Sequence, residues 1–150
     1  MIRLRRTQHS DPDFKMLVVA LDEELWQRYP AIQQNFAPHN KVDSTVRIIV
    51  AYAGDKPVGC GAFRPMEKTV MEIKRMYVDP TVRGRGIAKA ILEGLELWGR
   101  EEGFSESKLE TGFNQPEAIA VYKRANYVQI PNYPPYDKIT ESMCMSKFLT

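Results

Sequence analysis

The segment with the clearest chemical potential runs from Val78 to Lys89 and reads VDPTVRGRGIAK. Gly84 and Gly86 lack Cβ atoms, so the backbone at these positions can approach a ligand closely. A helical pattern begins directly afterwards, and the first amides of a helix form an anion site that the helix dipole reinforces. Three side chains add positive charge: Arg83, Arg85 and Lys89. The segment predicts a phosphate or pyrophosphate site, and the alternative is a solvated glycine turn.

Two common phosphate-binding patterns do not fit this segment. The P-loop pattern ends in Gly-Lys-Ser/Thr, which is absent here. The dinucleotide pattern Gly-x-Gly-x-x-Gly would need a third glycine at Lys89, and it would need an early strand before the turn. The strand before this turn is the fourth along the chain, so both interpretations are disfavoured.

The pattern Arg83-x-x-Gly86-x-Ala88, directly after Val78-Asp79-Pro80, resembles the acetyl-coenzyme A motif of the GNAT N-acetyltransferases. The resemblance covers nearly the whole chain, because the predicted order of strands and helices is also that of the family. It implies that the amides of the turn hold the pyrophosphate and that the preceding strand pairs with the pantetheine arm. The implied coenzyme-binding residues are Met76, Tyr77, Val78, Arg83, Gly84, Arg85, Gly86, Ile87, Ala88 and Lys89.

The segment from Gln115 to Tyr122 is similar to the second half of the family motif, Asn-x-x-Ala-x-x-x-Tyr. The resemblance implies that Tyr122 protonates the coenzyme A sulfur, a role that suits a phenol with a pKa near ~10. A core tyrosine on the inner face of a helix is the alternative. The family's asparagine position is Gln115 here and Asn114 comes one step earlier, so either amide could contact the pantetheine.

Two glutamates are candidates for the general base that acetyl transfer to an amine requires. Glu72 lies in the long strand before the glycine turn, and Glu110 lies in the next strand. In parallel neighbouring strands the two carboxylates could approach the same cleft, where apolar surroundings would raise the pKa of a carboxyl group. A solvated strand glutamate, or a water chain in the role of the base, is the alternative.

Cys60 and Cys144 lie in predicted strands, with no histidine within 20 positions of either, so an activated thiol is not expected. His9 and His39 are the only histidines and give no metal-binding pattern. The proline-rich segment from Pro131 to Asp137 contributes tyrosines that could line an acceptor pocket, and packing alone is the alternative. These tyrosines are Tyr133 and Tyr136.

Composition limits the function classes. The 150 residues carry 21 basic and 19 acidic side chains, a formal charge of +2 that argues against a nucleic-acid partner. The hydrophobic fraction of 43% and the charged fraction of 27% are typical of a globular domain. Two cysteines exclude a disulfide scaffold, and no apolar run approaches a membrane span. We therefore expect a single domain over residues 1–150, in the cytoplasm.

Hydrophobic periodicity predicts strands and helices in alternation. Ile2 to Thr7 is expected to form a half-buried strand, and Ala31 to Lys41 reads as a short helix followed by a loop. The remaining expected strands are Thr45–Ala53, Val58–Met66, Thr69–Val78, Ser107–Thr111, Tyr127–Ile130 and Thr140–Leu149. The expected helices are Pro12–Tyr29, Ile87–Glu102 and Gln115–Asn126. This pattern predicts an α/β (α+β) fold with a single sheet. The family resemblance implies that the sheet is mixed and mostly antiparallel with flanking helices, the GNAT acyl-CoA acyltransferase fold.

The sequence therefore predicts an N-acetyltransferase that moves an acetyl group from acetyl-CoA to a primary amine by direct transfer in a ternary complex. The acceptor would be a small molecule, an amino acid or a protein amine. A non-catalytic acyl-CoA binding or sensing domain of the same fold is the alternative. No metal cofactor, nucleic acid or membrane partner is expected, and a homodimer is left open.

Overall fold

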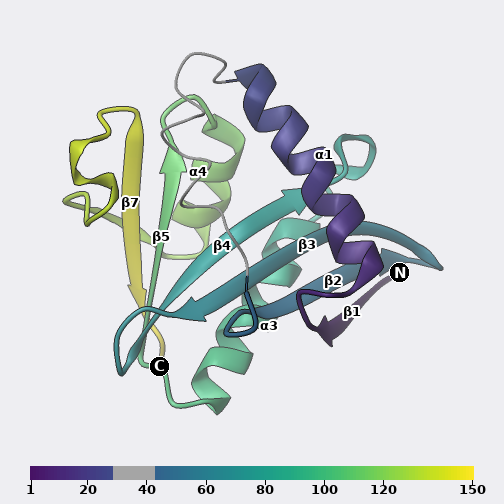
Figure 1. Ribbon diagram of the computed structural model, residues 1–150, viewed down its shortest axis with the longest axis horizontal. Helices are drawn as coiled ribbons and strands as arrows, with labels where there is room; N and C mark the ends of the chain where they lie inside the picture. Colours follow the sequence, from purple (N-terminus) through teal and green to yellow (C-terminus); the bar gives the residue numbers. More distant parts are fainter. Residues whose placement is uncertain (29–42) are drawn as a thin grey trace.

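The computed structural model describes residues 1–28 and 43–150 of the chain (Figure 1). Short 3-10 turns lie at Pro80–Val82 and Tyr136–Lys138. The strands are β1 (Ile2–Thr7), β2 (Arg47–Ala53), β3 (Lys56–Pro65), β4 (Val70–Val78), β5 (Glu106–Gly112), β6 (Val128–Ile130) and β7 (Ser142–Phe148). The helices are α1 (Pro12–Arg28), α3 (Ile87–Glu101) and α4 (Pro116–Arg124).

All seven strands form one sheet in the order β1-β2-β3-β4-β5-β7-β6. Every neighbouring pair is antiparallel except β4 and β5, which run parallel. The parallel pairing extends only from Val70↔Glu106 to Ile73↔Leu109. Beyond this point the two strands diverge, as Figure 1 shows. The mixed, mostly antiparallel sheet predicted from the sequence is confirmed.

Helices cover both faces of the sheet. On one face the apolar stripe of α3 packs against β2, β3 and β4, and the core there includes Phe63, Ile91 and Leu95. On the other face α1 packs with Phe14, Leu17 and Leu21 against residues of β2 and β3. A third cluster joins Tyr133, Tyr136 and Cys144 beside β7. The strands between these layers present alternate side chains to α1 and to α3.

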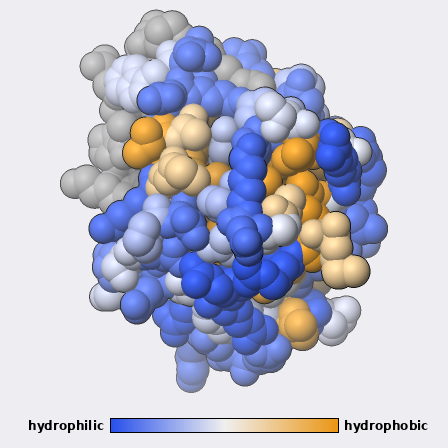
Figure 2. Space-filling model, turned by 90° about the vertical axis from the view of Figure 1, so that its right-hand side faces the viewer, coloured by the Kyte–Doolittle hydropathy of each residue, from blue (hydrophilic) through white to orange (hydrophobic). Residues whose placement is uncertain are grey.

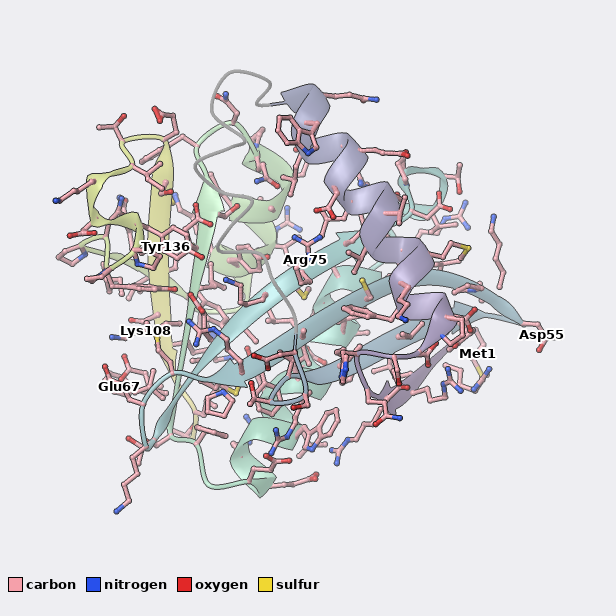
Figure 3. All side chains as sticks on the ribbon, in the orientation of Figure 1. Met1, Asp55, Glu67, Arg75, Lys108 and Tyr136 are labelled. Atoms are coloured by element: carbon pink, nitrogen blue, oxygen red, sulfur yellow. The ribbon has the colours of Figure 1, made fainter. Side chains whose placement is uncertain are left out.

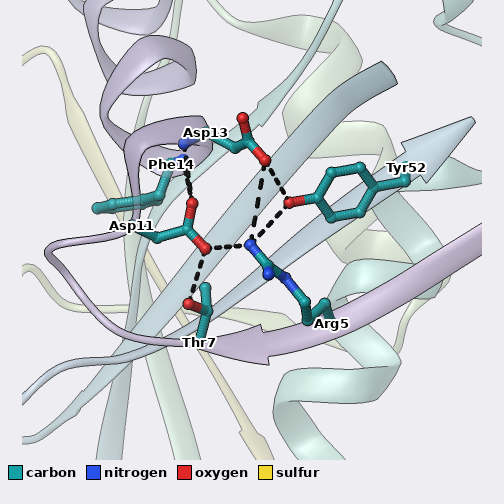
Figure 4. A network of polar contacts seen from close by, with 6 residues as sticks. All are labelled: Arg5, Thr7, Asp11, Asp13, Phe14 and Tyr52. Carbon is teal, nitrogen blue, oxygen red and sulfur yellow. Dashed lines mark hydrogen bonds and ion pairs between the residues drawn. The ribbon is translucent and has the colours of Figure 1, made fainter. Parts of the chain in front are cut away.

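A polar network fixes the N-terminal end of α1 (Figure 4). Asp11 accepts hydrogen bonds from the amides of Asp13 and Phe14 at 2.8 and 3.4 Å, so it acts as the N-cap. Arg5 of β1 forms an ion pair with Asp11 and donates to the hydroxyl of Tyr52 on β2. Burial opposes ionisation of Asp11, but the hydroxyl of Thr7 and the two amides outweigh it and hold the pKa of this carboxyl below its usual value. These contacts tie the start of α1 to two strands.

The differences from the sequence-based expectations lie at the edges of the fold. The four central side chains of β1 are exposed, whereas the alternation predicted a half-buried strand, because β1 is an edge strand. Figure 2 shows hydrophobic areas divided by hydrophilic side chains on the face that it presents. The helix and loop expected from Ala31 to Lys41 fall outside the described residues. The other elements begin and end within a few residues of the predicted positions.

Candidate active site

The predicted phosphate-binding turn connects β4 to α3. Gly84 and Gly86 adopt left-handed backbone conformations with φ of 81° and 80°, which side chains other than glycine rarely adopt. A Cβ atom at either glycine would meet no protein atom within 4 Å, so the turn opens to solvent. Ala90 donates its amide proton to the Gly86 carbonyl at 3.0 Å in the first turn of α3. The amides before Ala90 therefore precede the helical hydrogen bonds and face the turn, as an anion site requires.

The three predicted cations of this turn have different surroundings. Arg83 donates from Nε to the Val78 carbonyl at 2.8 Å, and its Nη2 forms an ion pair with Glu24 of α1 at 2.8 Å. Arg85 is exposed, and Lys89 is exposed with Glu93 at 3.9 Å. Arg83 thus braces the turn through protein contacts, and Arg85 and Lys89 are the cations that a solvent-borne phosphate would meet first.

The strand before the turn leaves one backbone edge open. On one side, β4 pairs with β5 only as far as Ile73. On the other side, the pairing of β4 with β3 continues to Val78. The pairing with β3 shifts between Cys60↔Tyr77 and Ala62↔Lys74, so β4 has a bulge there. The segment from Met76 to Val78 therefore lies on the diverging part of β4 and leads directly into the glycine turn. An extended ligand could pair with this edge.

Glu72 is buried on β4, where both of its carboxylate oxygens have partners. Arg64 of β3 donates from Nε to Oε1 at 2.9 Å and from Nη2 at 2.8 Å. The hydroxyl of Tyr133 donates to Oε2 at 2.7 Å. Only 1% of the side chain is exposed. This carboxylate holds a loop and a strand together, and protein donors already engage both of its oxygens.

Glu110 has different surroundings, at the point where β5 leaves β4. Ser142 of β7 donates to its Oε2 at 2.7 Å. Burial raises its pKa to about 7, an increase that the hydrogen bond from Ser142 and the charge of Lys74 reduce only in part. A carboxyl group that exchanges a proton near neutral pH is suited to general base catalysis. The parallel strands place Glu72 and Glu110 on the same face of the sheet.

Lys74 lies between the two glutamates on this face. Its Nζ is 3.8 Å from Glu72 Oε1 and donates to the hydroxyl of Tyr136 at 3.1 Å. Burial lowers its pKa, and only 8% of its side chain is exposed. Tyr133 and Tyr136 thus connect the β6–β7 loop to two side chains of β4. Figure 3 shows Tyr136 beside β7. Both tyrosines are buried, and together they form a wall beside Glu72 and Lys74 on this face of the sheet.

Tyr122 projects from α4 into the core on the opposite side of the sheet. It is 7% exposed, and its ring meets that of Tyr127 edge-on at 6.0 Å between centroids. Burial, together with the negative charge of Glu110, raises the pKa of the phenol above its usual value. The hydroxyl therefore stays protonated at neutral pH and can donate. The charge of Glu110 therefore acts on Tyr122, although the two side chains belong to different elements, β5 and α4.

The amide candidates lie at the start of α4. Gln115 is the N-cap, and it donates its backbone amide to the Gly112 carbonyl at 3.0 Å. Asn114 is exposed in the preceding turn. Both residues follow the C-terminal end of β5, beyond its pairing with β4.

The cysteines are in unreactive surroundings. Cys60 is fully buried on β3, and burial raises its pKa to about 12. Cys144 is buried on β7, and burial raises its pKa to about 11. Among residues 1–28 and 43–150 no group of three or more potential ligands is arranged to hold a metal ion. No helix in the same ranges is long and apolar enough to cross a bilayer.

Several site residues were not singled out from the sequence. Lys74 follows Glu72 by two positions in a strand, so the period of two could have placed it on the same face. Arg64 and Ser142 carry no such signal, because they reach the site through cross-strand register. Asp22 and Glu24 of α1 were also not predicted, since their partners Arg75 and Arg83 lie more than 50 positions away.

Comparison with known proteins agrees with this geometry. The chain is 34% identical over 133 residues to the IAA acetyltransferase of Azospirillum brasilense, covering 87% of each. A crystal structure described as an acyl-CoA N-acyltransferase from Klebsiella pneumoniae superposes with a TM-score of 0.84 at 32% identity, covering 100% of this chain and 99% of the other. The PaiA N-acetyltransferase of Thermoplasma acidophilum, solved with coenzyme A, shares the fold with a TM-score of 0.73 at 14% identity, covering 97% and 99%.

The sequence model of the acetyltransferase (GNAT) family matches residues 7–127. This range contains the glycine turn, the diverging strands and the three candidate acid–base residues, Glu72, Glu110 and Tyr122. The chain therefore belongs to the GNAT acetyltransferase family.

Proposed function

We propose that the protein transfers the acetyl group of acetyl-CoA directly to a primary amine. The observation that carries this proposal is the open edge of β4, which leads into the glycine turn while Glu110 and Tyr122 lie beside the divergence from β5. The edge and the turn suit an extended chain that ends in a pyrophosphate. Family members solved with coenzyme A or acetyl-CoA support the choice of ligand.

Glu110 is the general base in this proposal. Its pKa of about 7 lets it accept a proton at neutral pH, whereas Glu72 is engaged by Arg64 and Tyr133. The amine nitrogen attacks the thioester carbonyl carbon as Glu110 takes its proton. The C–S bond then breaks, and Tyr122 donates its proton to the departing sulfur. The N–C bond forms and the C–S bond breaks, so the products are an acetamide and free coenzyme A. The proton held by Glu110 returns to the Tyr122 oxygen through solvent before the next turnover.

Direct transfer is preferred to an acyl-enzyme route. A covalent intermediate needs a thiol that ionises near neutral pH, and burial raises the pKa of both cysteines far above that range. Amine and thioester must then meet in one complex. The wall made by Tyr133 and Tyr136 lies on the α1 face beside Glu110, where the amine would enter.

A non-catalytic binding domain is the second candidate. It would need only the edge of β4 and the glycine turn. The carboxyl of Glu110, whose burial costs free energy and raises its pKa to about 7, favours catalysis instead.

A screen of primary amines tests the proposal. Wild-type protein is incubated with acetyl-CoA and amines of several classes: polyamines, amino acids, aromatic amines and a lysine-containing peptide. Release of the coenzyme A thiol should exceed the amine-free rate with at least one class. Binding of coenzyme A without amine-dependent release in any class would support the binding domain and contradict the enzyme.

A further inference from the structure

We propose that α1 is a positioning element of the coenzyme site, through Asp22 and Glu24. Asp22 holds the bulge of β4, and Glu24 holds the glycine turn, so one helix sets the relative position of both coenzyme-binding elements. The inference rests on one part of the proposed function, namely that the bulge of β4 and the glycine turn bind the coenzyme.

The first contact joins Asp22 to Arg75. The Arg75 guanidinium donates from Nη2 to Asp22 Oδ1 at 2.5 Å, with only 2% of the arginine side chain exposed. The same residue lies in the bulge of β4 with a φ of 59°, a conformation that non-glycine residues rarely adopt. Figure 3 shows Arg75 on β4 beside α1. A buried cation at a strained position of the strand is thus held by a carboxylate of the helix.

The environment of Arg75 indicates that this position lowers the stability of the fold. Its Nε is buried without a hydrogen-bond partner, and no other buried side-chain nitrogen or oxygen in the described part of the chain is left so. Its carbonyl lies 3.4 Å from Cys60 Sγ. An unpaired buried donor and a left-handed backbone both cost free energy, and such costs concentrate at functional sites.

The second contact joins Glu24 to Arg83. The pair is 2.8 Å long, and the two side chains are 24% and 34% exposed. The Arg83 guanidinium also donates to the Val78 carbonyl and lies 5.6 Å from the Tyr77 ring. Arg83 thereby joins the end of β4, the turn and α1. In this arrangement its contribution to coenzyme binding comes from holding Gly84 and Gly86 in place, and a direct phosphate contact is not needed.

The two carboxylates lie on opposite sides of the apolar stripe of α1. A helix turns about 100° per residue, so Asp22 and Glu24 fall on either flank of the buried Leu21. The network around Asp11 fixes the other end of the same helix. With one end tied to β1 and β2 and each flank tied to a coenzyme element, α1 cannot rotate without displacing the bulge or the turn.

Single charge-neutral variants test the proposal. Asp22→Asn and Glu24→Gln keep the side-chain shape, and Glu23→Gln is the matched control because Glu23 is exposed between them. Calorimetric titration should show coenzyme A binding weakened about 3- to 10-fold in Asp22→Asn and Glu24→Gln, and unchanged in Glu23→Gln. Steady-state kinetics should show a raised KM for acetyl-CoA with kcat nearly unchanged at saturation.

A double-mutant cycle separates positioning from general destabilisation. Once Arg83→Gln has broken the ion pair, adding Glu24→Gln should weaken coenzyme A binding little further, whereas Glu24→Gln alone should weaken it fully. Wild-type affinity in Glu24→Gln and Asp22→Asn, even with a lowered melting temperature, would overturn the inference and leave the proposed function intact. Failure of wild-type protein to bind coenzyme A would overturn both. If Asp22→Asn does not fold, the partly exposed Glu24 pair decides the matter.

Discussion

The titration of Glu110 links its buried position to the rate of acetyl transfer. A pKa of about 7 means that about 1% of the carboxyl is ionised at pH 5 and about 90% at pH 8. Because only the ionised form accepts the amine proton, the rate that depends on Glu110 should rise about two orders of magnitude across this range and level off above pH 8.

The assay compares wild type with Glu110→Gln at each pH. Free amine concentration also rises with pH, and the ratio of the two kcat/KM values cancels that effect. The ratio should follow a single ionisation near pH 7. Glu67→Gln is the control, since this carboxyl lies in the exposed β3–β4 turn. A ratio that stays constant from pH 5 to pH 8 would refute the assignment of Glu110 as the base.

The same shift predicts a change in stability. The folded-state pKa lies above the unfolded value of 4.5, so folding favours the neutral carboxyl. This contribution is fully present below about pH 4.5 and is lost as the pH rises through about 7. The loss amounts to about 3 kcal/mol at 1.36 kcal/mol per pKa unit. Urea unfolding should therefore show Glu110→Gln gaining stability over wild type between pH 5 and pH 8, and a constant difference would contradict the cause given for the shift.

Three further predictions concern the coenzyme and the chemical step. Gly86→Val should weaken coenzyme A binding by about 2 kcal/mol, the scale of charge-assisted hydrogen bonds, while Gly103→Val, at a positive φ after the opposite end of α3, should leave titrated affinity unchanged. Tyr122→Phe should lower kcat roughly 100-fold with coenzyme affinity retained, and an unchanged kcat would reduce the residue to packing. Cys60→Ala with Cys144→Ala should keep most activity and give intersecting initial-rate lines, whereas parallel lines would indicate a covalent intermediate.

Much of the fold follows from local patterns in the sequence. The β-branched run of β2 and the stripe of Ile87, Ile91 and Leu95 in α3 each predict one element, and burial in the structure agrees with them. The glycine turn was also predictable, because the backbone conformations of Gly84 and Gly86 need a residue without a Cβ atom. These features depend on residues close together along the chain.

The arrangement around Glu72 and Glu110 could not be predicted in the same way. Both glutamates are strand residues of similar local sequence, yet one is paired with Arg64 and Tyr133 while the other is left with Ser142. The difference arises from cross-strand register and from the loop that brings Tyr133 over β4. Neither is encoded by spacing, so the sequence left both as candidates for the base.

The most direct test of the central claim is the fate of the acetyl group in one reaction. Wild-type protein, acetyl-CoA and the best amine from the screen are incubated together, and mass spectrometry follows the amine and the intact protein at successive times. The account predicts one acetyl group on the amine nitrogen, free coenzyme A in equal amount and no change in the mass of the protein. An unmodified amine with free acetate, or an acetylated protein that passes its group to the amine, would contradict it.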